Sequence, residues 1–186
     1  MQITQEIIDK AVELKACEEG VKWGKRMIGQ ELNPTNVVPK FYLWLGQIQD
    51  VKLNAELLDW CAIKKPDDAI IYASHLLTPE RIDWCATQYP IIALEDVALL
   101  LTPERLDWCA AQHPDLALEQ AANLLTKERL DWCATQDPNF ALKYAALLLT
   151  PERLDWCATQ YPHIALEEAK NLLTNERLDW CLKEKI

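Results

Sequence analysis

The side chains best suited to chemistry in this sequence are its cysteines, which can bind metals, pair as disulfides or act as nucleophiles. Six of the seven recur at a constant spacing of 24 residues. These six are Cys61, Cys85, Cys109, Cys133, Cys157 and Cys181. No C-x-x-C pair or Cys/His cluster could hold a metal. Packed helices lie about 8–10 Å apart, too far for the about 4.4–6.8 Å between the Cα atoms of a disulfide. We therefore predict six buried, reduced thiols, no metal site and no cofactor.

The acidic and basic side chains that could act in catalysis also recur, at the same positions in successive copies of a repeated sequence. An active site is one place where unlike groups converge, so this repetition argues against one. His75, His113 and His163 stand at different positions of their copies and have no evident acid or nucleophile partner. We predict no catalytic residue and a protein that is not an enzyme. The pocket of an enzyme would be expected where the N-terminal segment meets the first copy.

The pattern is a tandem repeat of 24 residues. The tripeptide Asp-Trp-Cys occurs six times at that spacing, first at Asp59 and last at Asp179. In chain order the copies are Asn54–Leu77, Thr78–Leu101, Thr102–Leu125, Thr126–Leu149, Thr150–Leu173 and a half copy, Thr174–Ile186. We therefore divide the chain into an N-terminal helical capping segment, residues 1–53, and a repeat region, residues 54–186.

Each copy carries the signals of two helices. From Thr78 onward a threonine opens the copy, where its hydroxyl can accept a hydrogen bond from a free helical N–H. A later proline, such as Pro90, cannot continue the first helix but can open a second one. Isolated helices of about ten residues are marginal in water, so the copies must stack on one another. The predicted fold is all-α, an α-solenoid of two-helix repeats behind an N-terminal cap.

The second helix of each copy should be buried along one face. On a wheel of 100° per residue, the apolar arc of the copy Thr78–Leu101 holds Leu94, Val97, Ala98, Leu100 and Leu101. Glu95, Asp96 and Leu99 lie on the opposite side. We therefore predict that Leu100 is buried and that Leu99 is exposed.

The tryptophan of Asp-Trp-Cys lies about 160–200° around the wheel from the innermost residues of its helix. Burial between the first helices of successive copies is the interpretation that we favour. The alternative is an aromatic ladder on one surface, with the arginine three residues earlier placed for a cation–π contact. The aspartate of one copy could also pair with an arginine or a tryptophan N–H of the next copy. Each such exposed pair would add about 0.2–1 kcal/mol.

The N-terminal segment contains the signals of three short helices. Thr4 can cap the first helix, and Gly20 offers a stop or hinge before the second, which contains Trp23. A loop at residues 33–36 then precedes a helix over residues 41–48. We interpret the segment as a cap on the apolar end of the stack. The alternative is that a basic cluster, Lys22, Lys25 and Arg26, binds an anionic patch on a partner.

The order T-P-E-x-L-x-x-C-A-x-x-x-P-x-x-A-L-x-x-A over Asn54–Ile186 resembles the leucine-rich repeat variant. That resemblance implies a short-period superhelix in which α-helical and 3₁₀-like segments alternate. The sequence departs from the family because acids mostly follow Leu94 and its equivalents, where the family usually has a basic residue. It also lacks a cysteine cluster for an iron–sulfur centre, so we carry over no redox role. The stretch Lys15–Trp23 is similar to the openings of small bacterial and phage proteins of unassigned role.

Charge is distributed unevenly along the chain. Residues 1–53 carry seven basic and seven acidic side chains, so the net charge of −10 lies wholly in residues 54–186. Such a surface repels nucleic acid, and we predict no direct binding of DNA or RNA. No apolar run approaches the roughly 20 residues of a membrane span, and the N-terminus lacks the features of a signal peptide. We therefore expect no membrane association and a cytoplasmic location.

Recognition is expected at positions that differ between otherwise matching copies, because the repeated positions specify the scaffold. The partner-binding candidates are Tyr89, His113 and Tyr161 at the turn between helices, Asp96, Gln120, Tyr144 and Glu168 on the second helix, and Leu99 and Leu147 beside them. The open alternative is that these positions are merely unconstrained. We predict a non-catalytic protein–protein interaction scaffold whose partner has a basic or mixed surface. The alternative function is a phage-type inhibitor or nucleic-acid mimic that blocks a host defence or nucleic-acid-handling complex.

Overall fold

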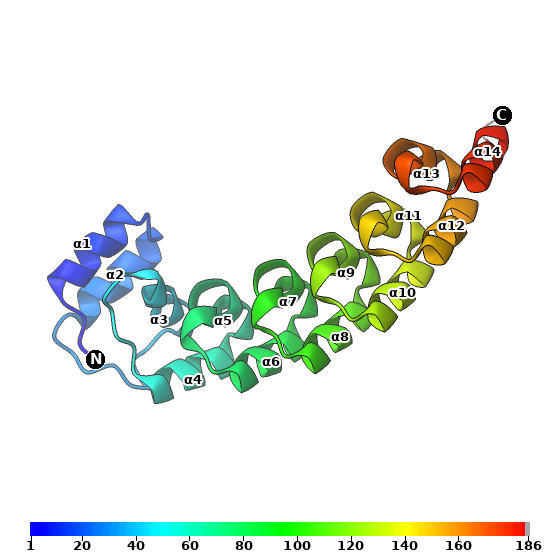
Figure 1. Ribbon diagram of the computed structural model, residues 1–186. Coiled ribbons are helices and arrows are strands. Elements are labelled where there is room, and N and C mark those ends of the chain that lie inside the picture. Colours follow the sequence, from blue (N-terminus) through cyan, green and yellow to red (C-terminus); the bar gives the residue numbers. More distant parts are fainter. Residues whose placement is uncertain (185–186) are drawn as a thin grey trace. The chain divides into compact units, whose positions relative to one another are not determined.

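A computed structural model describes residues 1–184 of the chain, and the backbone over this range is helical (Figure 1). Within these residues there is no strand, and only two isolated β-bridges occur, between residues 2 and 31 and between residues 3 and 28. The prediction of an all-α fold is confirmed. None of the described helices is long and apolar enough to cross a membrane. The last two residues of the half copy Thr174–Ile186 lie outside the described range.

The chain forms two compact units, Met1–Ile92 and Ala93–Ile186, which we call the N-terminal and C-terminal units. The helices of the N-terminal unit are α1 (Gln5–Glu13), α2 (Glu18–Met27), α3 (Pro39–Trp44), α4 (Ala55–Lys64), α5 (Pro66–Ala73) and α6 (Pro79–Gln88). Helix α1 packs on α2, while α3 packs on α4 and α5. Helix α3 continues as the 3₁₀ turn Leu45–Gln47, so the helix predicted over residues 41–48 begins earlier, at Pro39.

At the start of the N-terminal unit, the structure confirms one prediction from the sequence and contradicts another. The Thr4 hydroxyl accepts a hydrogen bond from the N–H of Ile7, which confirms the predicted cap. The predicted stop at Gly20 is wrong, because Gly20 lies inside α2. The chain turns instead at Lys15, whose φ of 59° is left-handed. A Cβ on Gly20 would stand 3.3 Å from the Phe41 ring, so this glycine serves close packing.

The first helix of each copy has the predicted length and cap. These helices are α4, α6, α8 (Pro103–Gln112), α10 (Lys127–Gln136), α12 (Pro151–Gln160) and α14 (Asn175–Glu184), each of ten residues. At the start of α6, the Thr78 hydroxyl accepts a hydrogen bond from the N–H of Arg81. The threonines that precede α8, α10, α12 and α14 make the same bond. The threonine caps are therefore confirmed.

The second helix of each copy is shorter than the predicted ten residues. α7 (Pro90–Asp96), α9 (Pro114–Gln120) and α13 (Pro162–Glu168) have seven residues each. A break and a separate 3₁₀ turn follow, at Ala98–Leu100, Ala122–Leu124 and Lys170–Leu172. At the break, Val97 has φ −135° and ψ 18°, so the 100° step of the helical wheel no longer applies beyond it. Leu94 and Val97 are buried as predicted, but Leu100 is 45% exposed, so that prediction is wrong.

The helices of the C-terminal unit lie in two rows (Figure 1). The first helices α8, α10, α12 and α14 make one row. In the other row α9, α11 (Pro138–Phe140) and α13 each pack against the first helices before and after them. Fully buried small residues and a leucine separate the rows, and they include Cys109, Ala110, Ala117, Leu118, Cys133, Ala134, Ala141, Cys157 and Ala158. The small side chains let the rows approach closely, and Leu118 fills the space between them.

Candidate functional site

The variable positions fall at opposite ends of the second helix. Tyr89, His113 and Tyr161 end a first helix and precede a second one. Asp96, Gln120 and Glu168 are the last residues of α7, α9 and α13. A helix of seven residues is about 10 Å long, so the two sets are separated by that length and do not form one contact point. The candidates therefore divide into a turn set and a set at the C-terminal end of the second helix.

The end set includes the most exposed large apolar residues of residues 1–184. Leu99 is 81% exposed and Leu147 is 82% exposed. The equivalent positions in the two copies between and after them are asparagines, Asn123 and Asn171. A leucine contributes little to stability at such exposure, because its apolar surface stays in water. These two leucines are therefore available for contact with another molecule.

A shallow groove of about 410 Å³ brings three of the predicted residues together. Its walls include Asp96 and Leu99 from one copy and Gln120 from the next. Glu95 and Asp96 are exposed at its edge, and Leu100 adds a second half-exposed leucine. The groove thus combines apolar contact area with carboxylates, a pairing that suits an apolar side chain flanked by Lys or Arg. Sequence reasoning missed Leu100 because the helical wheel placed it inside.

Tyr144 stands on a locally different helix. Here α11 continues as a π-helix over Ala141–Ala145, and the 3₁₀ turn Ala146–Leu148 follows. The Asp137 carboxylate accepts a hydrogen bond from the N–H of Phe140 and caps this helix, whereas the tyrosine or histidine at that position of α9 and α13 makes no such bond. The rings of Phe140 and Tyr144 lie 5.4 Å apart, and Tyr144 is 48% exposed. π-helical turns occur frequently at functional sites, and this one presents an aromatic side chain that a second ring supports, three residues before Leu147.

The turn set is more dispersed. Tyr89, in the N-terminal unit, is 39% exposed. Tyr161, in the C-terminal unit, is 37% exposed, and its ring lies 6.3 Å from that of His163. His113 is half-buried and precedes Pro114 at the start of α9. The end set, in contrast, contains the most exposed leucines of residues 1–184 and the groove of about 410 Å³, so we assign it, and not the turn set, as the candidate site.

Comparison with known proteins adds no relative. No family model matches the chain. No curated protein or solved structure matches it significantly. The assignment of the site therefore depends on the geometry and exposure of its own residues.

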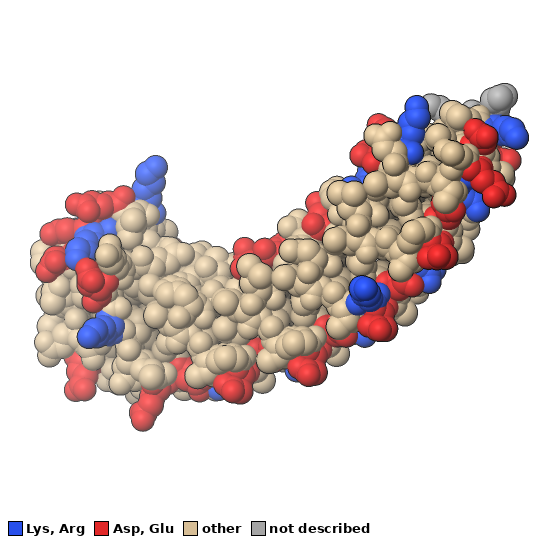
Figure 2. Space-filling view, viewed as in Figure 1, with Lys and Arg blue, Asp and Glu red and all other residues tan. Residues whose placement is uncertain are grey.

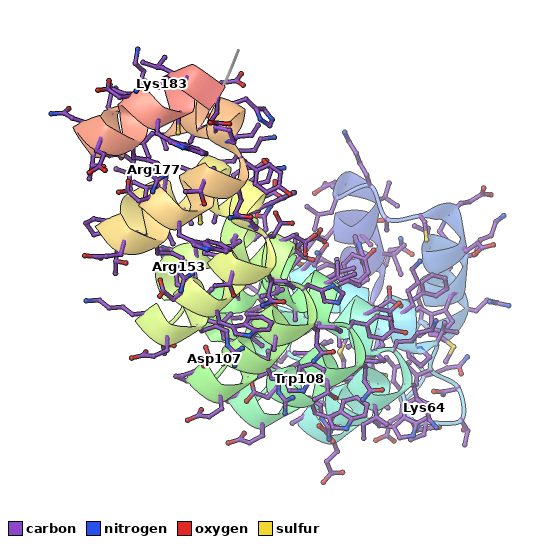
Figure 3. All side chains as sticks on the ribbon, turned by 90° about the vertical axis from the view of Figure 1, so that its right-hand side faces the viewer. Lys64, Asp107, Trp108, Arg153, Arg177 and Lys183 are labelled. Atoms are coloured by element: carbon purple, nitrogen blue, oxygen red, sulfur yellow. The ribbon has the colours of Figure 1, made fainter. Side chains whose placement is uncertain are left out.

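A second set of side chains, on the first helices of each unit, is formed by tryptophan and arginine. Each guanidinium lies 5.0–5.2 Å from the centroid of the tryptophan ring three residues later, and the pairs are Arg81 with Trp84, Arg105 with Trp108, Arg129 with Trp132, Arg153 with Trp156 and Arg177 with Trp180. Figure 3 shows Trp108, Arg153 and Arg177 along the row of first helices in the C-terminal unit. The rings of Trp108, Trp132 and Trp156 are each 37% exposed, so the favoured burial interpretation is wrong for them and the ladder is the observed arrangement.

The same arginines also reach the preceding copy. Nη2 of Arg153 lies 3.3 Å from Oδ2 of Asp131, and Nη2 of Arg81 lies 2.8 Å from Oδ2 of Asp59. This confirms the predicted pairing of an aspartate with the arginine of the next copy. The arginine thus forms a cation–π contact within its own copy and an ion pair with the preceding copy, each worth about 0.5–1 kcal/mol at a half-exposed site. Because the cation–π contact recurs in five copies and the ion pair in at least three, we interpret both as part of the scaffold.

The recurring cysteines lie in the core. All six are fully buried and none forms a disulfide within the described residues, and the Cys133 thiol lies 3.9 Å from the carbonyl oxygen of Ala110 in the preceding copy. Burial raises the pKa of the Cys61 thiol to about 12 and the pKa values of Cys85, Cys133 and Cys157 to about 11. Only the thiolate is a nucleophile, so these groups are unreactive near neutral pH. Cys17 is exposed.

We expect iodoacetamide to alkylate a single thiol, Cys17, in the folded protein at pH 8, because the other six are buried in the core. Mass spectrometry of the intact chain would show one adduct before unfolding and seven adducts in urea. A Cys17→Ser control should show none when folded. Rapid alkylation of several thiols in the folded protein would contradict the packed core.

Proposed function

We propose that the chain is an α-solenoid of 24-residue repeats, similar to the leucine-rich repeat variant, that serves as a non-catalytic protein-binding scaffold in the cytoplasm. The starts of α6, α8, α10, α12 and α14 support the repeat, because they fall at residues 79, 103, 127, 151 and 175. Each of these helices is preceded by a threonine whose hydroxyl caps it. A scaffold of this kind offers an extended surface whose outward residues can vary without loss of the core.

The observation that carries the proposal is the surface made by Leu99, Tyr144 and Leu147. All three project from the C-terminal ends of second helices or from the 3₁₀ turns after them, and all three are exposed. Tyrosine is enriched among residues that dominate binding energy, and exposed leucines supply apolar area around it. These are positions at which the copies differ, so the other copies do not present the same side chains there.

The charge of the C-terminal unit supports a basic or mixed partner. Residues 93–186 contain sixteen acidic and nine basic side chains. Figure 2 shows that most charged side chains along the edge formed by α8, α10 and α12 are acidic. Complementary charge raises the rate of encounter and selects among partners.

The distance between Leu99 and Leu147 limits which partner segments can contact both leucines. Leu99 and Leu147 lie two copies apart, and packed helices are about 8–10 Å from one another, so the leucines are about 16–20 Å apart. An extended strand of about six residues or three to four turns of helix covers that distance. We therefore propose a partner segment with two apolar anchors at that separation and Lys or Arg between them.

Affinity capture from a native lysate at low and at high salt tests this proposal. We expect a specific protein partner whose binding weakens with salt, because the rim is charged, but persists in part through the apolar anchors. A chain that captures no specific protein, or that turns over a small molecule, would contradict a non-catalytic scaffold.

Blocking of a nucleic-acid-handling complex is a second candidate function. It is favoured by four exposed glutamates that recur on the first helices of the C-terminal unit, Glu104, Glu128, Glu152 and Glu176. Carboxylates in such a row could occupy a basic groove in place of phosphates. Displacement of the captured partner by double-stranded DNA would support this function, and simultaneous binding of both would argue for the scaffold alone.

A further inference from the structure

The N-terminal unit contains a partly enclosed cavity of about 230 Å³. It lies among α1, α2, α3 and α5, so it is built from the N-terminal segment and the first copy together. This is the junction at which the sequence places the pocket of an enzyme, if the protein were one. The residues that line it are mainly apolar and include no carboxylate.

The walls of the cavity suit a flat apolar body. Four aromatic side chains line it: they are Trp23, Phe41, Trp44 and Tyr72. Gly20 and Ala16 line it as well, and their small size leaves the space open. An apolar cavity of about 150 Å³ holds benzene, so this one can hold a molecule larger than a single ring. A bicyclic aromatic group is the class of ligand that fits these walls.

The rim of the cavity is positively charged. Lys15 and Lys40 are exposed, and they are the only charged residues among those that line the cavity. Among residues 1–184, neither lysine has a carboxylate within 4 Å, although Lys40 attracts Asp68 from a greater distance. Lys15 is therefore the less compensated of the two cations. Its left-handed φ of 59° is uncommon for a residue with a side chain.

A neighbouring hollow adds to this positive potential. It shares Phe41 with the cavity and is lined by Lys22, Lys25, Arg26 and Glu19. Lys22 is paired with Glu18 on the same helix, so Lys25 and Arg26 supply most of the excess charge. An anionic group at the mouth of the cavity would therefore meet favourable potential from both sides.

We propose that this cavity binds a small aromatic carboxylate, with the ring system between the aromatic walls and the carboxylate at the rim beside Lys15 and Lys40. The aromatic faces supply apolar contact, and the lysines select the anion over neutral or cationic molecules of the same shape. This binding is independent of the proposed protein-binding surface, whose residues lie in the C-terminal unit.

Cys17 provides the readout, because it is exposed and also lines the cavity. We would measure its alkylation by iodoacetamide in the presence of 2-naphthoate, its neutral amide or 2-naphthylmethylammonium, with calorimetry in parallel. We expect 2-naphthoate to slow alkylation in a saturable way and to bind about fivefold to tenfold more tightly than the amide, with weaker binding of the cation. Equal binding of all three probes, or no protection by any of them, would overturn the proposal.

Two variants and one control variant separate the effect of charge from the effect of shape. Lys15→Met should remove most of the preference for 2-naphthoate over the amide and leave amide binding intact, whereas Lys52→Met, at an exposed lysine outside the cavity, should change neither. Ala16→Phe should fill the space and abolish binding of both probes. Circular dichroism would verify that each variant stays helical. Unchanged selectivity in Lys15→Met would contradict the role given to the rim.

Discussion

Replacement of Leu118 by alanine is expected to lower the free energy of unfolding by about 3 kcal/mol. Leu118 has no exposed surface and lies on α9 between the two rows of helices. Truncation of a buried leucine removes apolar contact and leaves a cavity, which together cost about 2.7–5 kcal/mol. For a chain of this size the midpoint of thermal unfolding should fall by about 6–12 °C. Unfolding in urea followed by circular dichroism would measure the loss.

The matched control is the same substitution at Leu99. This leucine is 81% exposed, so Leu99→Ala should change the free energy of unfolding by less than about 0.5 kcal/mol. Together, the two variants test which side chains of the second helix and its 3₁₀ turn face the core. The comparison is direct because both residues are leucines of the same repeated segment. Equal losses in the two variants would show that Leu99 is packed against the protein, and the candidate surface would then lose its main apolar anchor.

The double variant Tyr144→Ala, Leu147→Ala is expected to weaken binding of the captured partner by about 30-fold or more. The Tyr144 ring lies 5.4 Å from that of Phe140, and Leu147, three residues later in the chain, is 82% exposed. Truncation of a hot-spot residue costs about 2 kcal/mol or more, and each 1.4 kcal/mol is about a tenfold change in affinity. Calorimetry with the purified partner would measure the change.

Leu182→Ala is the control for that experiment. Leu182 is 48% exposed on α14, in the other row of the same unit. It should bind the partner with the affinity of the original chain, and both variants should remain helical. If Leu182→Ala weakened binding as much as the double variant, the interface would lie on the row of first helices. The tryptophan and arginine ladder would then be the better candidate.

The first helices were the most predictable part of the fold. A threonine cap, a proline or lysine after it and the buried Ile82, Cys85 and Ala86 of α6 follow from local rules. Cap hydroxyls bond to N–H groups three residues away, so a short stretch of sequence contains the information that sets where such a helix begins. The absence of disulfides between the buried cysteines was predictable as well. Their spacing places one cysteine in each copy, too far from the next to be bridged.

The second helices could be predicted only in part. Pro90 and its equivalents mark where they begin, but no proline or glycine marks the break at Val97, Ala121 and Ala169. The exposure of the tryptophans was also hard to predict, because a helical wheel places them between the core and the solvent. Their half-exposure depends on arginines that stack on them and reach an aspartate about one copy away.

In this chain, local sequence signals predict where helices begin but not every residue that they expose. By itself, the sequence determined an all-α chain, the caps and starts of the helices in the repeat region, the inward cysteines and the outward direction of Leu99. Only the tertiary structure decided that Leu100 is exposed, that Tyr144 stands on a π-helix and that a cavity forms beside Trp23. These features depend on contacts between residues far apart in the chain. Such contacts shift helix phase and leave space between elements, and no periodicity along the sequence records them.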